Sequence, residues 1–322
     1  MNLAMTMTQM NKEISLIEER IKEVTNTDNQ MITTAANHLI DAGGKRIRPI
    51  FVLLSSQFGQ ANQDEIINVA VALELIHMAS LVHDDVIDFA SVRRGQPTVN
   101  EKWNNGTAIY TGDFIFARTL ELLKSFKNSR LHQVLSNTMH ELCIGEIDQI
   151  RDKYRMNQNL LTYMRRIKRK TALLISSSTE MGALAANVDE HHVKLLKKYG
   201  YYIGMSYQII DDILDFTSTE KELGKPVGND LINGNLTLPA LLALDDPDIY
   251  QSIEKIFTSS KREQEEIEQL INKIKTSENI ERAYQFSQAY LRKAFQVLEK
   301  LPDIEAKVTL KQIAVYLSKR KH

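Results

Sequence analysis

Apolar residues recur along most of this chain at the spacing of one face of an α-helix. The clearest example is the stretch IINVAVALELIHMASLV, where a single stripe contains Ile66, Val69, Ala70, Leu73, Ile76, His77, Ser80 and Leu81. A second example, REQEEIEQLINKIK over residues 262–275, combines an apolar face with a charged one and predicts an amphipathic helix. The alternation typical of strands is almost absent. We therefore expect an all-α protein with on the order of ten helices or more.

The residues that interrupt helices are few and clustered. Proline occurs six times and glycine thirteen times, and no proline falls between Pro97 and Pro226. Such sparse punctuation favours long helices. The interruptions gather in three segments that we predict as loops or helix ends, each with cationic residues beside glycine: DAGGKRIRP (41–49), RRGQPT (93–98) and LGKPVGNDLINGNLTLP (223–239).

No linker or change of composition divides the chain. We therefore predict one domain over residues 1–322, with residues 1–30 as a peripheral N-terminal helix. Hydrophobic residues make up 43% of the chain and charged residues 25%, the usual globular mixture. The net charge of −1 argues against a generally basic surface for nucleic acid.

The single cysteine, Cys143, excludes an intrachain disulfide and suits a reducing cytosol, so we expect a cytoplasmic protein. The stretch MNLAMTMTQMNKEISLIEERI lacks the basic start and apolar core of a signal peptide. No stretch reaches about eighteen uncharged apolar residues, the length of a membrane span. The best candidate, IINVAVALELIHMASLV, carries Glu74 and His77, so no transmembrane segment is predicted.

Two aspartate-rich stretches with the same spacing interrupt otherwise apolar helical patterns. They are LVHDDVIDF, with Asp84, Asp85 and Asp88, and QIIDDILDF, with Asp211, Asp212 and Asp215. In each, the first and last aspartates lie one helical turn apart on a shared face. Crowded carboxylates repel one another, and oxygen-only ligands favour a hard divalent ion such as Mg²⁺. Two such clusters facing each other would hold several Mg²⁺ ions around one diphosphate.

A single cluster of this kind is most often a solvated helix face. Two copies with the same spacing, each flanked by isoleucine, leucine, valine and phenylalanine, are hard to explain in that way, because aspartate is rarely buried unless it is paired or holds a cation. Cationic residues that would complete an anion pocket are Lys45, Arg48, Arg93, Arg94, Lys170 and Lys225. His77 lies two turns before Asp84 on the same face and is a further candidate contact.

The ordered motifs GGKRIRP, LVHDDVIDFASVRRGQPT, GDFIFA, KTA, YQIIDDILDF and LGKPVGND…GNLTLP resemble those of the trans-isoprenyl diphosphate synthase family. They run in this order from residue 41 to residue 240, and the helical tail fits too. The resemblance implies an all-α fold of the isoprenoid-synthase type, a helical bundle around a deep central cavity. It also implies a Mg²⁺-dependent enzyme, a trans-prenyltransferase that condenses isopentenyl diphosphate with an allylic diphosphate.

The resemblance also implies the roles of individual residues. The aspartates that match the family's Mg²⁺ and catalytic positions are Asp84, Asp85, Asp88, Asp211, Asp212 and Asp215. The residues that match its isopentenyl diphosphate contacts are Lys45, Arg48, His77 and Arg94. Those that match its allylic diphosphate contacts are Arg93, Lys170, Thr171, Gln208 and Lys225, with Lys170 also in the catalytic set. Many relatives have lysine where GNLTLP has Asn235, which cannot supply that charge, so a contact there is in doubt.

Within the family, the resemblance extends to the catalytic large subunit of the two-component enzymes that make heptaprenyl diphosphate for menaquinone side chains. It implies a small regulatory partner subunit, component 1, and the change at Asn235 agrees with this assignment. The alternative is a homodimeric polyprenyl synthase that makes a chain of another length.

Three other classes fit the residues less well. A terpene cyclase is expected to carry an Asn/Asp–Ser/Thr–Glu second motif in place of a second aspartate cluster. A helical metal-dependent phosphohydrolase would use the His83–Asp84 pair but needs further metal-binding histidines, for which no matching spacing is present. A non-enzymatic regulatory subunit is expected to have lost one aspartate cluster, and both are intact.

Product length is expected to depend on two small residues before the first cluster. Ser80 lies one helical turn before Asp84, and Ala79 lies beside that path. A chain growing from a diphosphate at Asp84 would extend past them, and short-chain members of the family carry bulky aromatics there. The alternative is that both are small because another helix packs closely.

Overall fold

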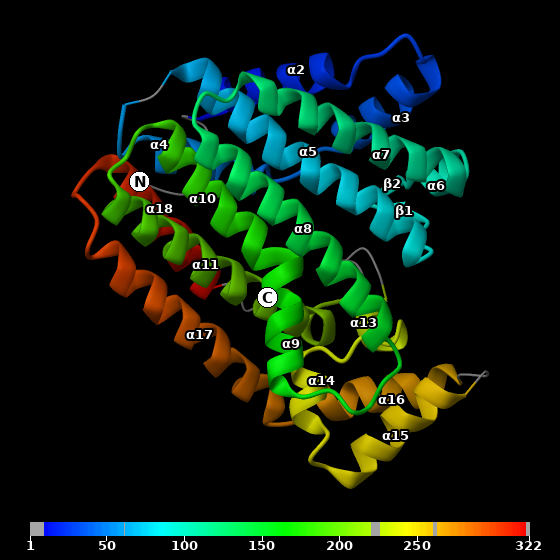
Figure 1. Ribbon diagram of the computed structural model, residues 1–322. Coiled ribbons are helices and arrows are strands. Elements are labelled where there is room, and N and C mark those ends of the chain that lie inside the picture. The colour runs from blue at the N-terminus through cyan, green and yellow to red at the C-terminus, as the bar shows by residue number, and fades with distance from the viewer. Residues whose placement is uncertain (1–9, 61, 220–225, 260–262, 320–322) are drawn as a thin grey trace. The chain divides into compact units, whose positions relative to one another are not determined.

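The computed structural model describes residues 10–60, 62–219, 226–259 and 263–319, and this part of the chain is almost entirely helical (Figure 1). The described elements up to residue 152 are α2 (Asn11–Thr25), α3 (Gln30–Asp41), α4 (Ile47–Ser56), α5 (Gln63–Ile87), β1 (Val92–Arg93), β2 (Gln96–Pro97), α6 (Val99–Lys102), α7 (Asn105–Leu122), the 3₁₀ turn η1 (Leu123–Ser125) and α8 (Ser129–Asp152). The described elements after it are α9 (Leu160–Ile167), the π-helical turn η2 (Lys168–Ala172), α10 (Leu173–Ala185), α11 (Glu190–Thr217), α13 (Asn229–Ile232), α14 (Leu238–Ala243), α15 (Pro247–Thr258), α16 (Gln264–Lys275), α17 (Asn279–Leu298) and α18 (Glu305–Ser318).

Polar side chains at the N-caps fix where several helices begin. Asn29, Asn62, Asn159 and Asp246 each accept hydrogen bonds from backbone N–H groups in the first turn of α3, α5, α9 and α15. These N–H groups have no partner within the helix, so each cap stabilises its helix by about 1 kcal/mol.

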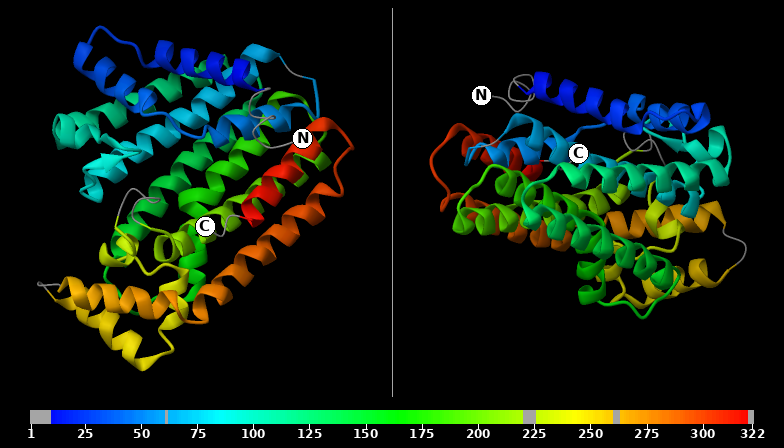
Figure 2. Two further views of the ribbon diagram at one scale, coloured as in Figure 1. Left: turned by 180° about the vertical axis from the view of Figure 1, so that it is seen from behind. Right: turned by 45° about the horizontal axis from the view of Figure 1, so that its top comes forward.

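The chain divides into two compact units, and unit 1 comprises Met1–Met139, Leu174–Gly200 and Val297–Ile313. Its central helix is α5, which packs along α7, α4 and α2 (Figures 1 and 2). Residues 69–76 of α5 are all buried, so the helix is covered on more than the predicted stripe. By length and composition α5 is apolar enough to cross a membrane, but 72% of its apolar window is buried inside the protein, as in a core helix.

Unit 2 comprises His140–Leu173, Tyr201–Gln296 and Ala314–His322. Its core has two apolar clusters. One includes Phe216 at the end of α11 together with residues of α13 to α16, and α15 and α16 pack side by side as a hairpin (Figure 2). The other joins Tyr163 of α9 to α11, α14 and α17. The end of α11, which carries the second aspartate cluster, therefore lies in a packed region.

The predicted all-α fold is confirmed, and the amphipathic helix predicted over 262–275 is α16, with its apolar face buried. The segment 93–98, predicted as a loop, contributes to a small antiparallel hairpin in which Val92 pairs with Pro97 and Arg93 with Gln96. The predicted division into one domain stays a prediction.

Candidate active site

The first aspartate cluster lies in unit 1, at the C-terminal end of α5. The Asp88 N–H donates to the Asp84 carbonyl over 2.8 Å, and both side chains are half-buried. Asp85 is only 1% exposed, so a solvated helix face does not describe this cluster. Beyond the helix, Phe89 adopts a left-handed φ of 52°, and the chain turns toward the β1–β2 hairpin.

The hairpin returns a cation to the cluster. Arg93 Nε donates a hydrogen bond to Asp85 Oδ1 over 2.7 Å, and Arg93 Nη2 forms an ion pair with the same oxygen at 2.6 Å. Burial raises the pKa of Asp85 above its ordinary value despite this partner, and the charges of Asp84 and Asp88 raise it further. The cluster therefore holds more negative charge than Arg93 alone neutralises, and a bound cation would be favoured there.

Several arginines lie within electrostatic range of His77, two turns earlier on α5. Burial lowers the pKa of the His77 imidazole well below its ordinary value, and the charges of Arg48, Arg94 and Arg93 lower it further. A Cβ added to Gly44 would stand 2.5 Å from Nη1 of Arg94, so the first predicted loop and the hairpin touch. Unit 1 thus brings two of the predicted isopentenyl diphosphate contacts, Arg48 and Arg94, within electrostatic range of a third, His77.

The remaining predicted residues of unit 1 lie along the same elements. Lys45 is exposed in the loop before α4. Ala79 is fully buried, while Ser80 is half-buried and its hydroxyl donates to the His77 carbonyl over 2.9 Å. The His83 ring lies 3.2 Å from the Ile109 carbonyl and 3.3 Å from Asp113 Oδ1, both on α7. Among the described residues no third metal-ligating side chain joins this pair, which disfavours the phosphohydrolase alternative.

The second aspartate cluster lies in unit 2, at the C-terminal end of α11. Asp212 is 4% exposed, and protein donors hold both of its oxygens: Tyr163 Oη donates to Oδ2 over 2.7 Å and Gln208 Nε2 to Oδ1 over 2.8 Å. Burial raises the pKa of Asp212 to about 7, and the charge of Asp230 contributes to the rise. Like Asp85, this carboxylate lies where a positive charge would be favoured.

The chain after α11 folds back onto the cluster. The Asp215 carbonyl accepts from the Gly228 N–H over 2.7 Å, and its buried carboxylate accepts from the Asp230 N–H over 3.2 Å. Asn235 belongs to the same return, since its N–H donates to the Asp230 carbonyl over 2.9 Å. Asp211 is half-buried, and Lys225 lies outside the described residues.

The KTA motif forms the π-helical turn η2, a rare geometry that recurs at functional sites. Lys170 Nζ donates to Gln149 Oε1 over 3.0 Å. Thr171 Oγ1 donates to Gln208 Oε1 over 2.5 Å, so a chain of hydrogen bonds runs from Thr171 through Gln208 to Asp212 and Tyr163. Three predicted site residues therefore belong to one network within unit 2.

Sequence reasoning missed Tyr163, which lies outside every motif, and it gave no role to Arg46, although Arg46 lies within GGKRIRP. Tyr163 meets Asp212 across 49 positions, and Arg46 meets Glu74 across 28. One signal in the sequence could have pointed to Arg46. Glu74 is a charged residue inside the apolar stretch of α5, and a buried carboxylate needs a partner.

The two clusters suit Mg²⁺, because they offer carboxylate oxygens, the ligands that this ion prefers. The pKa of Asp85 and of Asp212 is raised, so a nearby cation would stabilise their charged forms. Within the described ranges, no group of three or more His, Cys, Asp and Glu side chains is arranged to hold a metal ion by itself. Mg²⁺ typically takes one or two carboxylates and completes its shell with water and substrate phosphate, so a diphosphate would supply the missing oxygens.

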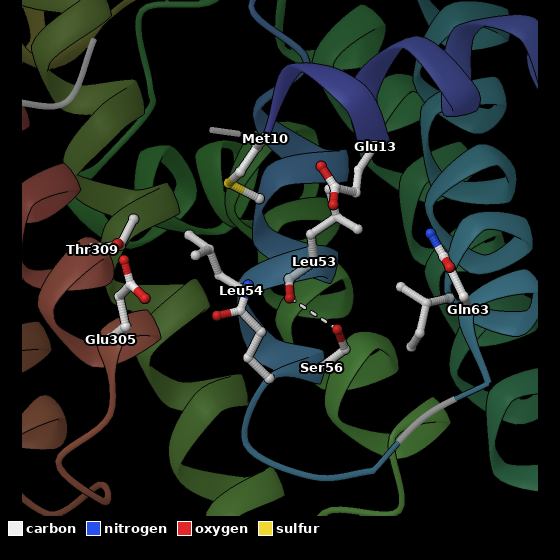
Figure 3. A pocket seen from close by; sticks show the side chains of 10 residues that line it. Met10, Glu13, Leu53, Leu54, Ser56, Gln63, Glu305 and Thr309 are labelled. Carbon is white, nitrogen blue, oxygen red and sulfur yellow. Dashed lines mark hydrogen bonds between the residues drawn. The ribbon is translucent and has the colours of Figure 1, made fainter. Parts of the chain in front are cut away.

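A separate cavity of about 580 Å³ lies in unit 1 (Figure 3). It is lined by Met10, Glu13, Leu53, Leu54, Ser56, Gln57, Gln63, Ile66, Glu305 and Thr309. None of the predicted site residues is among them, so this cavity takes no part in the proposed chemistry.

The helical fold and the two aspartate clusters define an enzyme of the isoprenyl diphosphate synthase class. The chain belongs to the polyprenyl synthetase family, which matches residues 29–274. It is 52% identical over 321 residues to heptaprenyl diphosphate synthase component 2 of Bacillus subtilis (strain 168), covering 100% of this chain and 92% of the relative. It is 51% identical to the protein of the same name from Geobacillus stearothermophilus, covering 97% of each.

Solved structures agree. The heptaprenyl diphosphate synthase of Staphylococcus aureus superimposes with a TM-score of 0.92 at 46% identity, covering 97% of this chain and 99% of that one. A polyprenyl synthase from Caulobacter crescentus CB15, complexed with calcium and isoprenyl diphosphate, gives a TM-score of 0.93 at 28% identity, covering 99% and 98%. The predicted family is confirmed, and the chain is a trans-prenyltransferase.

Proposed function

We propose that this chain is the catalytic subunit of a Mg²⁺-dependent enzyme that builds all-trans heptaprenyl diphosphate for menaquinone side chains. The names of the two bacterial relatives support this product and a second component. The proposal is carried by the close approach of Arg94 to Gly44, in the loop before Arg48, and by the arginine charges that act on His77, on the helix that leads to Asp84, Asp85 and Asp88.

The cationic group in unit 1 suits the diphosphate of isopentenyl diphosphate. Arg48 and Arg94 supply guanidinium forks, which bind phosphate oxygens in pairs, and Lys45 adds a point charge. Burial, and after it the charges of the arginines, hold the pKa of His77 well below its ordinary value, so the neutral imidazole can donate one hydrogen bond without adding to the repulsion among the arginines.

Family resemblance assigns the two aspartate clusters to the allylic diphosphate. The Caulobacter crescentus relative is complexed with calcium and an isoprenyl diphosphate, which supports a divalent-cation diphosphate site in this family. Mg²⁺, when bound by the aspartates, would stabilise the negative charge that develops on the departing diphosphate. The further allylic contacts proposed by family resemblance are Arg93, Lys170, Thr171, Gln208 and Lys225.

The reaction follows from these roles. The bond between the allylic carbon and its diphosphate breaks, and the π electrons of the isopentenyl double bond attack the resulting cation. Loss of a proton, taken by the released diphosphate according to family analogy, restores an alkene. Arg48, His77 and Arg94 hold the attacking substrate in place, and this orientation supplies much of the rate.

The proposal includes a small partner subunit and a cytoplasmic location. Purified alone, the chain should make little or no long-chain product from isopentenyl diphosphate and an allylic diphosphate with Mg²⁺. Adding the small partner subunit should restore long-chain synthesis. Full long-chain activity from this chain as a homodimer would contradict the two-component proposal, and no prenyl transfer under either condition would contradict the enzymatic one.

A further inference from the structure

Arg46 is the centre of an ion network in unit 1 that is buried at Arg46 and Glu74 and partly exposed at Glu18. Its side chain is almost fully buried, and its Nε donates to Glu18 Oε1 over 2.8 Å. Its Nη1 donates to Glu74 Oε1 over 3.0 Å and its Nη2 to the Ile40 carbonyl over 3.1 Å. One guanidinium therefore ties the loop before α4 to α2, through Glu18, and to α5, through Glu74.

The backbone at Arg46 shows that these contacts, more than local preference, fold the loop. Arg46 has φ 46° and ψ 35°, the left-handed conformation that non-glycine residues rarely adopt, and it stands at the N-cap of α4. Gly43 also has a positive φ, of 73°. A strained conformation at a non-glycine residue persists only where its surroundings hold it, and here the buried Glu74 and the partly exposed Glu18 do so.

The network lies between the groups assigned to isopentenyl diphosphate. Lys45 precedes Arg46 and is exposed, while Arg48 follows it by two residues and is half-buried. On α5, Glu74 lies one helical turn before His77, on neighbouring positions of the same face. A shift of the loop against α5 would therefore move Lys45 and Arg48 relative to His77.

We propose that Arg46 is a positioning residue, which through Glu74 holds Lys45 and Arg48 in register with His77 and so preforms the isopentenyl diphosphate site. This inference rests on the proposed function. Two glutamates offset the charge of Arg46, so its contribution comes from geometry and not from attraction of the substrate. Lysine cannot replace it, because a single ammonium does not reproduce the planar fork that meets both carboxylates and a carbonyl.

The test uses Arg46→Lys and Glu74→Gln in the chain assembled with its partner subunit. Both variants keep a polar group of similar size, and each should raise the KM for isopentenyl diphosphate about tenfold. The KM for the allylic primer and the kcat at saturating substrates should stay within about twofold of the wild type, because the loop displacement affects one substrate site. The double variant should be little worse than either single variant, since both remove the same contact.

Glu13→Gln is the matched control. Glu13 lies on α2 like Glu18, but it lines the separate cavity and does not contact Arg46 (Figure 3). Its kinetic constants should equal those of the wild type. Titration calorimetry with isopentenyl diphosphate alone gives a readout independent of turnover, and binding should weaken by the same factor in Arg46→Lys and Glu74→Gln.

Several outcomes would overturn the inference. These are an unchanged KM for isopentenyl diphosphate in either folded variant, equal rises in the KM of both substrates, and a fall in kcat that simply tracks a lowered melting temperature. If Arg46→Lys fails to fold, Glu74→Gln alone decides. A wild-type complex that binds isopentenyl diphosphate but forms no product would contradict the proposed function, while the calorimetric comparison would still test Arg46.

Discussion

Tyr163 donates a 2.7 Å hydrogen bond to Oδ2 of Asp212, and both side chains are buried. With Gln208 on the other oxygen, the carboxylate of Asp212 is held in one orientation. Carboxylates near a metal are commonly oriented in this way by neighbours that never touch the ion. Tyr163 is thus a candidate support of the second aspartate cluster, although it lies outside every motif.

Tyr163→Phe should weaken the enzyme's response to Mg²⁺. Loss of the hydroxyl leaves one oxygen of a buried carboxylate without its donor, which costs about 1–3 kcal/mol of unfolding free energy. We expect turnover to fall about tenfold or more at low Mg²⁺ and to recover in part as Mg²⁺ is raised. Initial rates across a Mg²⁺ titration, with thermal unfolding, measure both effects.

Tyr199→Phe is its control. Tyr199 is also buried, but its hydroxyl donates to the Leu310 carbonyl over 2.7 Å and meets no aspartate. It should lose stability with an unchanged Mg²⁺ dependence. Identical Mg²⁺ titrations for Tyr163→Phe and the wild type would show that Tyr163 does not support Mg²⁺ binding.

Asp84→Ala and Asp211→Ala should each lower turnover at least about 10²-fold while the helical fold survives. Because crowded carboxylates repel, the melting temperature without Mg²⁺ should stay the same or rise. Far-ultraviolet circular dichroism and steady-state rates check the two parts. Asp64→Ala, at the exposed first turn of α5, is the control and should behave like the wild type. Normal turnover in either cluster variant is incompatible with two metal-binding clusters.

The lowered pKa of His77 predicts that the folded protein loses stability in acid. Its pKa in the folded protein is held well below the ordinary value of about 6.5, so the unfolded chain binds the proton more readily. The stability from neutral His77 is therefore present above pH 6.5 and is lost as the pH falls below it, by up to about 1.4 kcal/mol per pH unit. Urea midpoints at several pH values between about 5 and 8 should show this slope.

His77→Gln should flatten the acid slope, because it removes the titrating group. His140→Gln should keep the acid slope of the wild type, since the His140 side chain is 71% exposed and is therefore not buried like that of His77. A wild-type slope in His77→Gln would show that other groups cause the acid sensitivity.

Ser80→Phe should shorten the products if Ser80 lines the path of the growing chain. Ser80 is half-buried and Ala79 is fully buried, so we expect phenylalanine to be tolerated better at Ser80. At Ala79, overpacking should cost about 1–3 kcal/mol in addition to any change in product. Mass spectrometry of the products and unfolding curves separate the two readings. Unchanged chain length from active, folded variants at both positions would place the length control elsewhere.

The helical fold was predictable because apolar spacing and sparse proline and glycine are local signals. The spacing of Asp84, Asp85 and Asp88 also predicted a carboxylate cluster on a helix, with Asp84 and Asp88 on a shared face. The sequence could not tell that Asp85 is the buried member, because that depends on the hairpin returning Arg93 to it. The partnership of Tyr163 with Asp212 likewise depends on packing between distant helices.

The central claim is tested most directly by the products of the chain assembled with its small partner subunit, given isopentenyl diphosphate, a short allylic diphosphate and Mg²⁺. Mass spectrometry should find all-trans heptaprenyl diphosphate, formed only with Mg²⁺ and lost in Asp84→Ala and Asp211→Ala. Release of phosphate without new carbon–carbon bonds, or prenyl transfer that persists without Mg²⁺ or in both variants, would contradict the account.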